Sequence, residues 1–265
     1  MKRIASSPFM FAFIAFLIGL NLRPILASIG PLFPVLQREA GLSSTEFSLL
    51  TTLPVAMMGL VALSGPWLLA RTGAVRGITV GLSILLFACL FRGFSTSLTG
   101  LMCTALAGGA SIGMIQALMP ALIKKEYTQS ASTFMSLFST GIMAGAALAA
   151  ATAEPLFTRL DLKPTLAIAG LLALLALIFW LSWARRRQVE KTVFAEVTLS
   201  SSRTGLLLLF FGIGTGAYTL VLAWLPPLYI QAGWSARSSG YMLAWLIADI
   251  GGGVFLSFPA KLYCL

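Results

Sequence analysis

The chain has 265 residues, of which 58% are hydrophobic and only 10% are charged, and its formal net charge at pH 7 is +10. A soluble domain carries about 25% charged residues, so this composition excludes an ordinary water-soluble protein. The basic residues lie between apolar runs rather than in an aromatic-interleaved patch, which argues against a nucleic-acid partner. The sequence contains no His and no paired Cys spacing, so we expect neither a metal nor a cofactor.

Eight apolar stretches are long enough to cross a bilayer, which takes about 20 residues for a helix. Backbone groups in lipid must pair within their own segment, so the predicted fold class is an all-α integral membrane bundle. The stretches cover roughly residues 9–36, 47–70, 76–93, 98–122, 133–156, 164–184, 205–230 and 239–259.

The connection between the sixth and seventh stretches is the long, polar and charged one. It predicts a flexible linker between two bundles. We therefore expect an N-terminal bundle of six helices at 1–184, a cytoplasmic linker at 185–204 and the start of a second bundle at 205–265.

The basic residues predict the orientation in the membrane, because cytoplasmic loops carry an excess of Lys and Arg. With the N-terminus in the cytoplasm, that side holds twelve basic residues and the outer side five, while Arg23 belongs to neither. Met1-Lys2-Arg3 resembles the start of a secretory signal, but no small-residue cleavage pattern follows, so we expect the first span to be retained. The five outer residues are Arg38, Arg92, Arg159, Lys163 and Arg237.

Arg23 stands inside the first apolar stretch, in Asn21-Leu22-Arg23-Pro24. A guanidinium stays charged at any ordinary pH, and at mid-membrane it costs roughly 2.5–3.5 kcal/mol. Such a residue indicates a watery cavity with an anion to bind. Pro24, Pro31 and Pro34 each remove a backbone donor and should break the span beside it. The alternative is a kinked packing helix in which Arg23 pairs with a protein carbonyl or carboxylate.

Three further residues are weaker candidates for the lining of that cavity. Gln116 is an amide in the fourth span that could orient a small polar substrate, although a helix–helix hydrogen bond explains it nearly as well. Tyr218 and Trp224 lie in the seventh span and could face the same space.

Asp249 is the acidic residue deep within a predicted span, the eighth. Desolvation raises the pKa of a carboxyl toward the physiological range, so it could carry a proton. It could equally be the counter-ion of Arg23, or an acid with no role in transport.

Glycine pairs at a spacing of four predict close helix packing. They are Gly109-x-x-x-Gly113, Gly141-x-x-x-Gly145 and Gly212-x-x-x-Gly216.

An internal repeat links the first and seventh spans. Ala40-Gly41-Leu42-Ser43 recurs as Ala232-Gly233-Trp234-Ser235, and a proline-containing segment precedes each copy. An even number of spans separates the copies, so they run parallel, as in transporters made of two six-helix halves. Chance similarity between two helix ends is the alternative. Since such a design needs twelve spans and we expect eight, the second half should be incomplete.

Five stretches of the sequence match a known family: Ile18-Gly19-Leu20-Asn21-Leu22-Arg23-Pro24, Gly30-Pro31-Leu32-Phe33-Pro34, Leu50-Thr51-Thr52-Leu53-Pro54, Gln116-Ala117-Leu118-Met119-Pro120 with Ile123-Lys124-Lys125, and Ala223-Trp224-Leu225-Pro226. They resemble the cyanate transporter family of the major facilitator superfamily, which also includes nitroimidazole transporters. The resemblance implies a bacterial inner-membrane permease that moves a small solute such as cyanate by alternating access, with Arg23 and Asn21 at the anion. One departure is Ala70, where the superfamily usually has an Asp before Arg71-Thr72-Gly73.

Together these features predict a secondary transporter of a small anion, monomeric and embedded in the bilayer, with Asp249 as a candidate for proton coupling. No nucleophile–base pair, phosphate loop or carboxylate pair is evident, so we do not expect an enzyme. The alternatives are a non-transporting remnant or membrane assembly partner and, within the transporters, an exporter of drug-like solutes.

Overall fold

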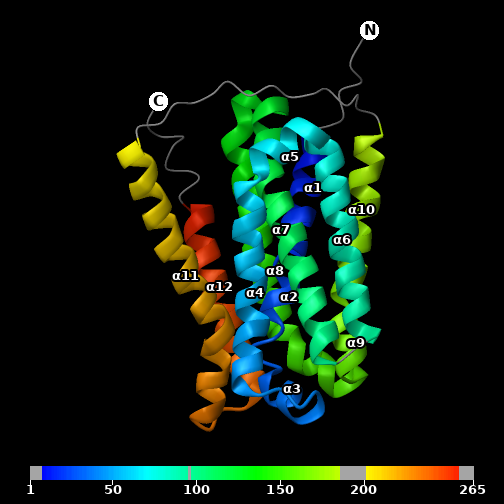
Figure 1. Cartoon of the computed structure of the whole chain (residues 1–265), viewed down its shortest axis with the longest axis vertical. Helices are drawn as coiled ribbons and strands as arrows, with labels where there is room; N and C mark the ends of the chain where they lie inside the picture. The colour runs from blue at the N-terminus through cyan, green and yellow to red at the C-terminus, as the bar shows by residue number, and fades with distance from the viewer. Residues whose placement is uncertain (1–7, 95–96, 186–200, 257–265) are drawn as a thin grey trace.

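The computed structural model of the chain describes residues 8–94, 97–185 and 201–256. Every regular element in these ranges is a helix, and the long helices run side by side along the long axis of the molecule (Figure 1). This confirms the all-α class. In chain order the helices are α1 (Pro8–Asn21), α2 (Pro24–Ala27), α3 (Phe33–Glu39), α4 (Ser44–Leu63), α5 (Gly65–Thr72), α6 (Ala74–Phe94), α7 (Leu98–Glu126), the 3₁₀ turn η1 (Thr128–Ser130), α8 (Ala131–Leu160), α9 (Leu162–Ala167), α10 (Ala169–Ala184), α11 (Ser201–Gln231) and α12 (Ala236–Leu256).

Within the described ranges, seven helical segments are long and apolar enough to cross a membrane. They correspond to the first seven predicted spans, and the eighth prediction falls on α12. The polar connection lies between the end of α10 at Ala184 and the start of α11 at Ser201. Most of the predicted linker is outside the described residues, so the division into two bundles stays a prediction.

The first span is broken beside Arg23, as its prolines led us to expect. α1 ends at Asn21, and Pro24 begins the single turn of α2. The Ile29 N–H then bonds to the Leu26 carbonyl at 3.3 Å, a separation of three residues rather than four, so the α-helical pattern stops. Pro54 and Pro120, by contrast, lie inside continuous helices.

Two of the three glycine pairs form close helix contacts. A methyl group added at Gly141 or Gly145 of α8 would overlap the main chain of α1, and one added at Gly109 or Gly113 of α7 would overlap the main chain of α4. These backbones therefore approach as closely as the small-residue pattern predicted. The pair Gly212-x-x-x-Gly216 differs, because nothing in the described part of the chain lies within 4 Å of either added methyl.

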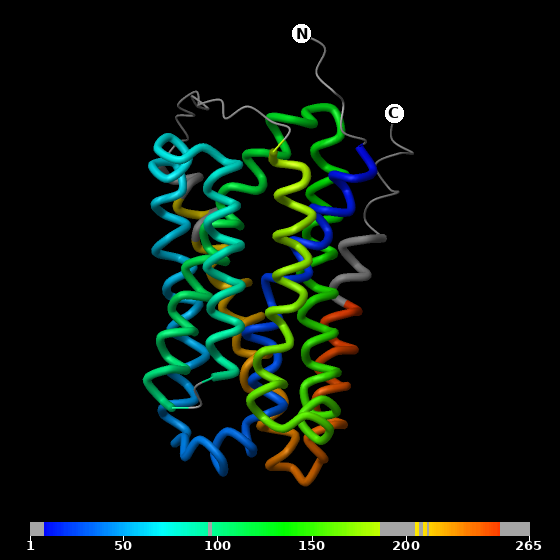
Figure 2. The backbone as a smooth tube through the Cα atoms, turned by 90° about the vertical axis from the view of Figure 1, so that its right-hand side faces the viewer, coloured from blue at the N-terminus to red at the C-terminus, as the bar shows by residue number. Residues whose placement is uncertain are grey.

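The two copies of the repeat have the same local structure. Gly41 and Gly233 have positive φ angles of 65° and 93°, which glycine adopts without steric cost. The serine that follows caps the next helix: the Ser43 Oγ accepts from the Glu46 N–H at 3.3 Å, and the Ser235 Oγ accepts from the Ser238 N–H at 3.0 Å. Both turns lie at the same end of the molecule (Figure 2), as parallel copies require.

Helices α11 and α12 lie beside the N-terminal helices. α12 packs along α8, while α11 reaches α2. An ion pair joins α12 to α8, with the Arg237 Nε 3.0 Å from the Glu154 Oε2. The break in the first span therefore faces a helix from the second part of the chain.

Candidate functional site

Arg23 lies in the gap between α1 and α2, and only 7% of it is exposed. It borders a small cavity of about 10 Å³ between α2, α4 and α11. The cavity thus forms where the first span meets the seventh, the two spans that the repeat relates. Its lining residues are Arg23, Leu26, Thr51, Val55, Thr219, Leu222 and Ala223.

The guanidinium of Arg23 lies over the ring of Tyr218, with its Cζ 5.4 Å from the ring centroid. This is a cation–π contact, which offsets part of the cost of burying the charge. The Arg23 Nε is buried without a hydrogen-bond partner, and no carboxylate in the described part of the chain pairs with the side chain. Arg23 therefore keeps donor capacity for a ligand.

Two threonines contribute polar oxygen atoms to the same cavity. The Thr51 hydroxyl donates to the Ser48 carbonyl at 2.9 Å, and the Thr219 hydroxyl donates to the Thr215 carbonyl at 2.7 Å. Because these hydroxyl protons are used within their own helices, the threonine oxygens can only accept further hydrogen bonds. Arg23 is thus the strong donor at the cavity. The sequence analysis missed both threonines, although Thr51 stands in one of the motif stretches.

The other predicted lining residues lie elsewhere. Asn21 is 3% exposed, and its Nδ2 donates to the Leu17 carbonyl at 2.7 Å, so its amide group serves its own helix. Gln116 is half-buried on α7 and does not line the Arg23 cavity. Trp224 packs against Phe47 with ring centroids 5.7 Å apart, also outside the cavity.

Asp249 lies exposed on α12. Asp249 and Arg23 do not form an ion pair in the described ranges, so Asp249 is not the counter-ion of Arg23 in this structure. The proton-coupling role of Asp249 stays a prediction.

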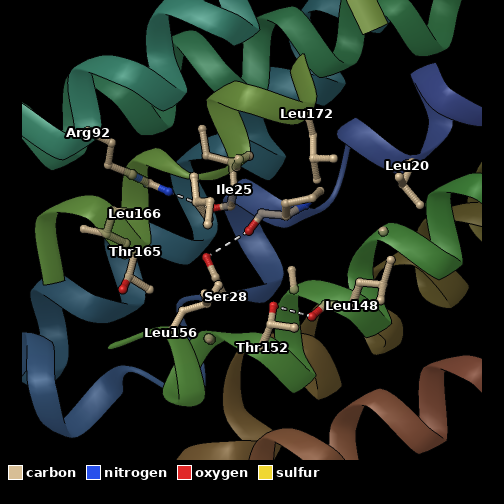
Figure 3. Close-up of a pocket in the computed structure, with 16 residues that line it drawn as sticks. Leu20, Ile25, Ser28, Arg92, Leu148, Thr152, Leu156, Thr165, Leu166 and Leu172 are labelled. Atoms are coloured by element: carbon tan, nitrogen blue, oxygen red, sulfur yellow. Dashed lines mark hydrogen bonds between the residues drawn. The ribbon is translucent and has the colours of Figure 1, made fainter. Parts of the chain in front are cut away.

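A second arginine is buried in the bundle, and the sequence analysis did not identify it as a candidate site residue. The sequence analysis counted Arg92 among the outer basic residues, and the structure shows that its side chain is only 1% exposed and that its Nη1 donates to the Ile25 carbonyl at 2.6 Å (Figure 3). In a continuous helix that carbonyl would accept from the N–H of Ile29, which instead bonds to Leu26. The break therefore leaves an acceptor unused, and Arg92 takes it. The sequence holds no comparable signal, because an apolar run precedes Arg92 but the polar Ser95-Thr96-Ser97 follows it closely, as at the end of a span.

The short helix α2 thus lies between two buried guanidinium groups. Arg23 and Leu26 are on the face toward α4 and α11, whereas Pro24, Ile25 and Ser28 are on the opposite face, beside Arg92. With no described acid paired to either arginine, the centre of the bundle carries a positive potential. Such a field attracts small anions and repels cations.

The sequence matches the Major Facilitator Superfamily over residues 6–261. It is 37% identical over 244 residues to the cyanate transport protein CynX of Escherichia coli strain K12, covering 91% of this chain and 64% of that protein. It is 31% identical over 233 residues to the uncharacterized transporter YycB of Bacillus subtilis strain 168, covering 86% of this chain and 58% of that protein.

A 2-nitroimidazole transporter of Escherichia coli strain K12 is 26% identical over 230 residues, covering 84% of this chain and 58% of that protein. Among solved structures, a peptide transporter POT (E310Q mutant) in complex with alafosfalin superposes with a TM-score of 0.59 at 16% identity, covering 80% of this chain and 46% of the other. The structural likeness concerns the fold alone. The chain spans no more than 64% of the length of these curated relatives.

Proposed function

The chain belongs to the Major Facilitator Superfamily, and on this basis we propose that it moves a small anion, with cyanate as the first substrate to test, across the membrane by alternating access. The similarity to a cyanate transport protein supports this substrate class. The proposed orientation has the N-terminus in the cytoplasm, as the distribution of basic residues favours.

One observation carries the proposal: Arg23 is buried beside a cavity at the contact between the first and seventh spans, without a carboxylate partner in the described ranges. An unpaired cation in a low-dielectric site is costly. A bound anion would neutralise it, and one edge of the Arg23 guanidinium can donate two parallel hydrogen bonds to the anion.

The size of the cavity restricts the substrate. About 10 Å³ is roughly the space that one water molecule needs. A solute therefore enters when α4 and α11 separate, and the apolar walls from Leu26, Val55 and Leu222 favour a small anion with few polar groups. Cyanate, a linear anion of three atoms, meets both conditions.

The direct test is uptake of labelled cyanate into liposomes that contain the purified chain. Arg23→Gln should reduce the initial rate at least about tenfold, because it removes a charged donor from the site. Arg159→Gln is the matched control, since Arg159 is exposed, and it should retain the rate. Equal rates for the unmutated chain and Arg23→Gln would contradict the assignment of Arg23. A folded, unmutated chain without uptake would favour the non-transporting alternative.

Competition distinguishes between the two compounds named for the relatives. Excess unlabelled cyanate should suppress the uptake, whereas 2-nitroimidazole, the compound named for one relative, should not. Suppression by 2-nitroimidazole but not by cyanate would contradict cyanate as the substrate.

We further propose that Asp249 couples transport to protons. Asp249→Asn should abolish accumulation driven by a pH gradient, because an amide cannot carry a proton, and should leave exchange of internal for external cyanate intact. The measurement compares gradient-driven uptake with exchange in the same liposomes. Gradient-driven accumulation by Asp249→Asn at the unmutated level would exclude this role.

A further inference from the structure

A second and larger cavity lies on the other face of α2. Its volume is about 80 Å³, against the roughly 10–15 Å³ that one water requires. It is bounded by the end of α1, by α2, by α8 and by α9 and α10, with Arg92 of α6 at one side (Figure 3). Most of its wall is aliphatic, with Leu20, Leu148, Leu156, Leu166 and Leu172 among the lining residues.

Arg92 lines this cavity and has two donors without a hydrogen-bond partner. Its Nη1 bonds to the Ile25 carbonyl, whereas its Nε and Nη2 are buried without a hydrogen-bond partner. In a guanidinium group the Nε and Nη2 hydrogens point in parallel from one edge. That edge matches two oxygens of a phosphate or a carboxylate.

The hydroxyl groups around the cavity are not available as donors to an oxyanion, because each already donates to a main-chain carbonyl. Ser28 donates to the Pro24 carbonyl at 2.9 Å, Thr152 to the Leu148 carbonyl at 2.7 Å, and Thr165 to the Asp161 carbonyl at 2.6 Å. No acidic side chain of the described residues lines the cavity. The site therefore combines an uncompensated positive charge with apolar walls.

We propose that this cavity binds an oxyanion, a phosphate or a carboxylate, through the Nε and Nη2 edge of Arg92. The site is separate from the Arg23 cavity, and the two lie on opposite faces of α2. The oxyanion belongs to a lipid head group or to a free ion. The aliphatic wall and the position of Leu148, 53% exposed on the outer surface of α8, suit an oxyanion attached to an apolar chain.

The test uses the purified 265-residue chain in detergent, with two arms that separate the sources. In the first arm, native mass spectrometry counts the phosphatidylglycerol or phosphatidylcholine molecules that remain bound. In the second arm, the melting temperature is measured with inorganic phosphate and with chloride at the same ionic strength.

Three variants give the comparison. Arg92→Gln removes the fork of donors. Ala149→Leu places a larger side chain in the cavity wall and leaves the Arg92–Ile25 hydrogen bond in place, so it tests the site even if Arg92→Gln does not fold. Arg159→Gln removes an equal charge from an exposed position on α8.

For a lipid ligand, the unmutated chain and Arg159→Gln should retain about tenfold more phosphatidylglycerol than phosphatidylcholine, and the two cavity variants should lose that preference. For a free ion, phosphate should raise the melting temperature of the unmutated chain and of Arg159→Gln more than chloride does. It should not raise the melting temperature of the two cavity variants in this way. Either pattern supports the proposal. It is overturned if neither ligand binds, or if the cavity variants bind as well as the unmutated chain.

Discussion

Buried arginines mark both faces of the broken first span, and they differ in what occupies their donors. Arg92 donates to the Ile25 carbonyl that the break leaves unused, so part of its side chain has a structural role. Arg23 has an aromatic ring instead of a hydrogen-bond partner. The contact with the ring leaves the N–H groups of the guanidinium free to donate hydrogen bonds to a ligand. A carboxylate partner would have occupied those N–H groups.

The contact between Arg23 and Tyr218 leads to a prediction about stability. The Tyr218 hydroxyl is buried without a hydrogen-bond partner, so Tyr218→Phe should leave the melting temperature unchanged or slightly higher. Tyr218→Leu removes the ring and should cost about 0.5–2 kcal/mol from the cation–π contact. Thermal unfolding in detergent measures both. An equal loss in the two variants would mean that the hydroxyl, not the ring, stabilises this contact.

The residues that the sequence indicates most clearly are those that bring a charge into an apolar environment or break a helix. Arg23 and the nearby prolines are such residues, because both features are costly in lipid whatever their neighbours. Thr51, Thr219 and the position of Arg92 depend on which face of a helix meets protein. Membrane helices are apolar on most faces, so periodicity does not indicate that face.

At the scale of helices, the three glycine pairs differ in what lies next to them: two contact another helix backbone and one faces open space. The sequence pattern is the same in all three pairs, yet only those of α7 and α8 meet another backbone in the described ranges. The pattern permits close approach but does not identify a partner helix. This is why the third pair could not be distinguished from the first two by sequence.

The difference gives a matched pair of substitutions. Gly145→Ala should destabilise the chain by about 1–3 kcal/mol, because its methyl would overlap the Leu20 carbonyl and force α1 and α8 apart. Gly216→Ala meets open space and should be neutral or stabilise α11 by up to about 1 kcal/mol through helix propensity. Thermal or denaturant unfolding of both variants checks this. A larger loss in Gly216→Ala than in Gly145→Ala would contradict the packing described for α8.

For the whole molecule, the ion pair between Glu154 and Arg237 links the N-terminal helices to α12. The Arg237 side chain is 54% exposed, so the pair contributes less than about 1 kcal/mol to stability. Under the proposed mechanism of alternating access, the helices on the two sides of this pair would separate at one end and then at the other, so the pair would favour the conformation that is closed at its own end.

We expect Glu154→Gln to open the Arg23 cavity more often from the end of the molecule where the pair lies. A cysteine introduced at Thr219, a lining residue, reports this through its rate of reaction with a membrane-impermeant thiol reagent. The rate should rise several-fold in Glu154→Gln and return when Glu154 and Arg237 are exchanged. Arg159→Gln, at the same end of α8, serves as the control. An unchanged rate in Glu154→Gln would show that the pair does not restrain this motion.

The hydrogen bond between Arg92 and Ile25 determines which residue at the Arg23 cavity would move when α11 shifts. It attaches α2, and with it Arg23, to α6, whereas Tyr218 belongs to α11. When α11 shifts, the positive charge should stay stationary in the frame of the first six spans while the phenol ring travels. Exposure of the guanidinium to one compartment or the other would then depend on where the tyrosine is, with no displacement of the arginine itself.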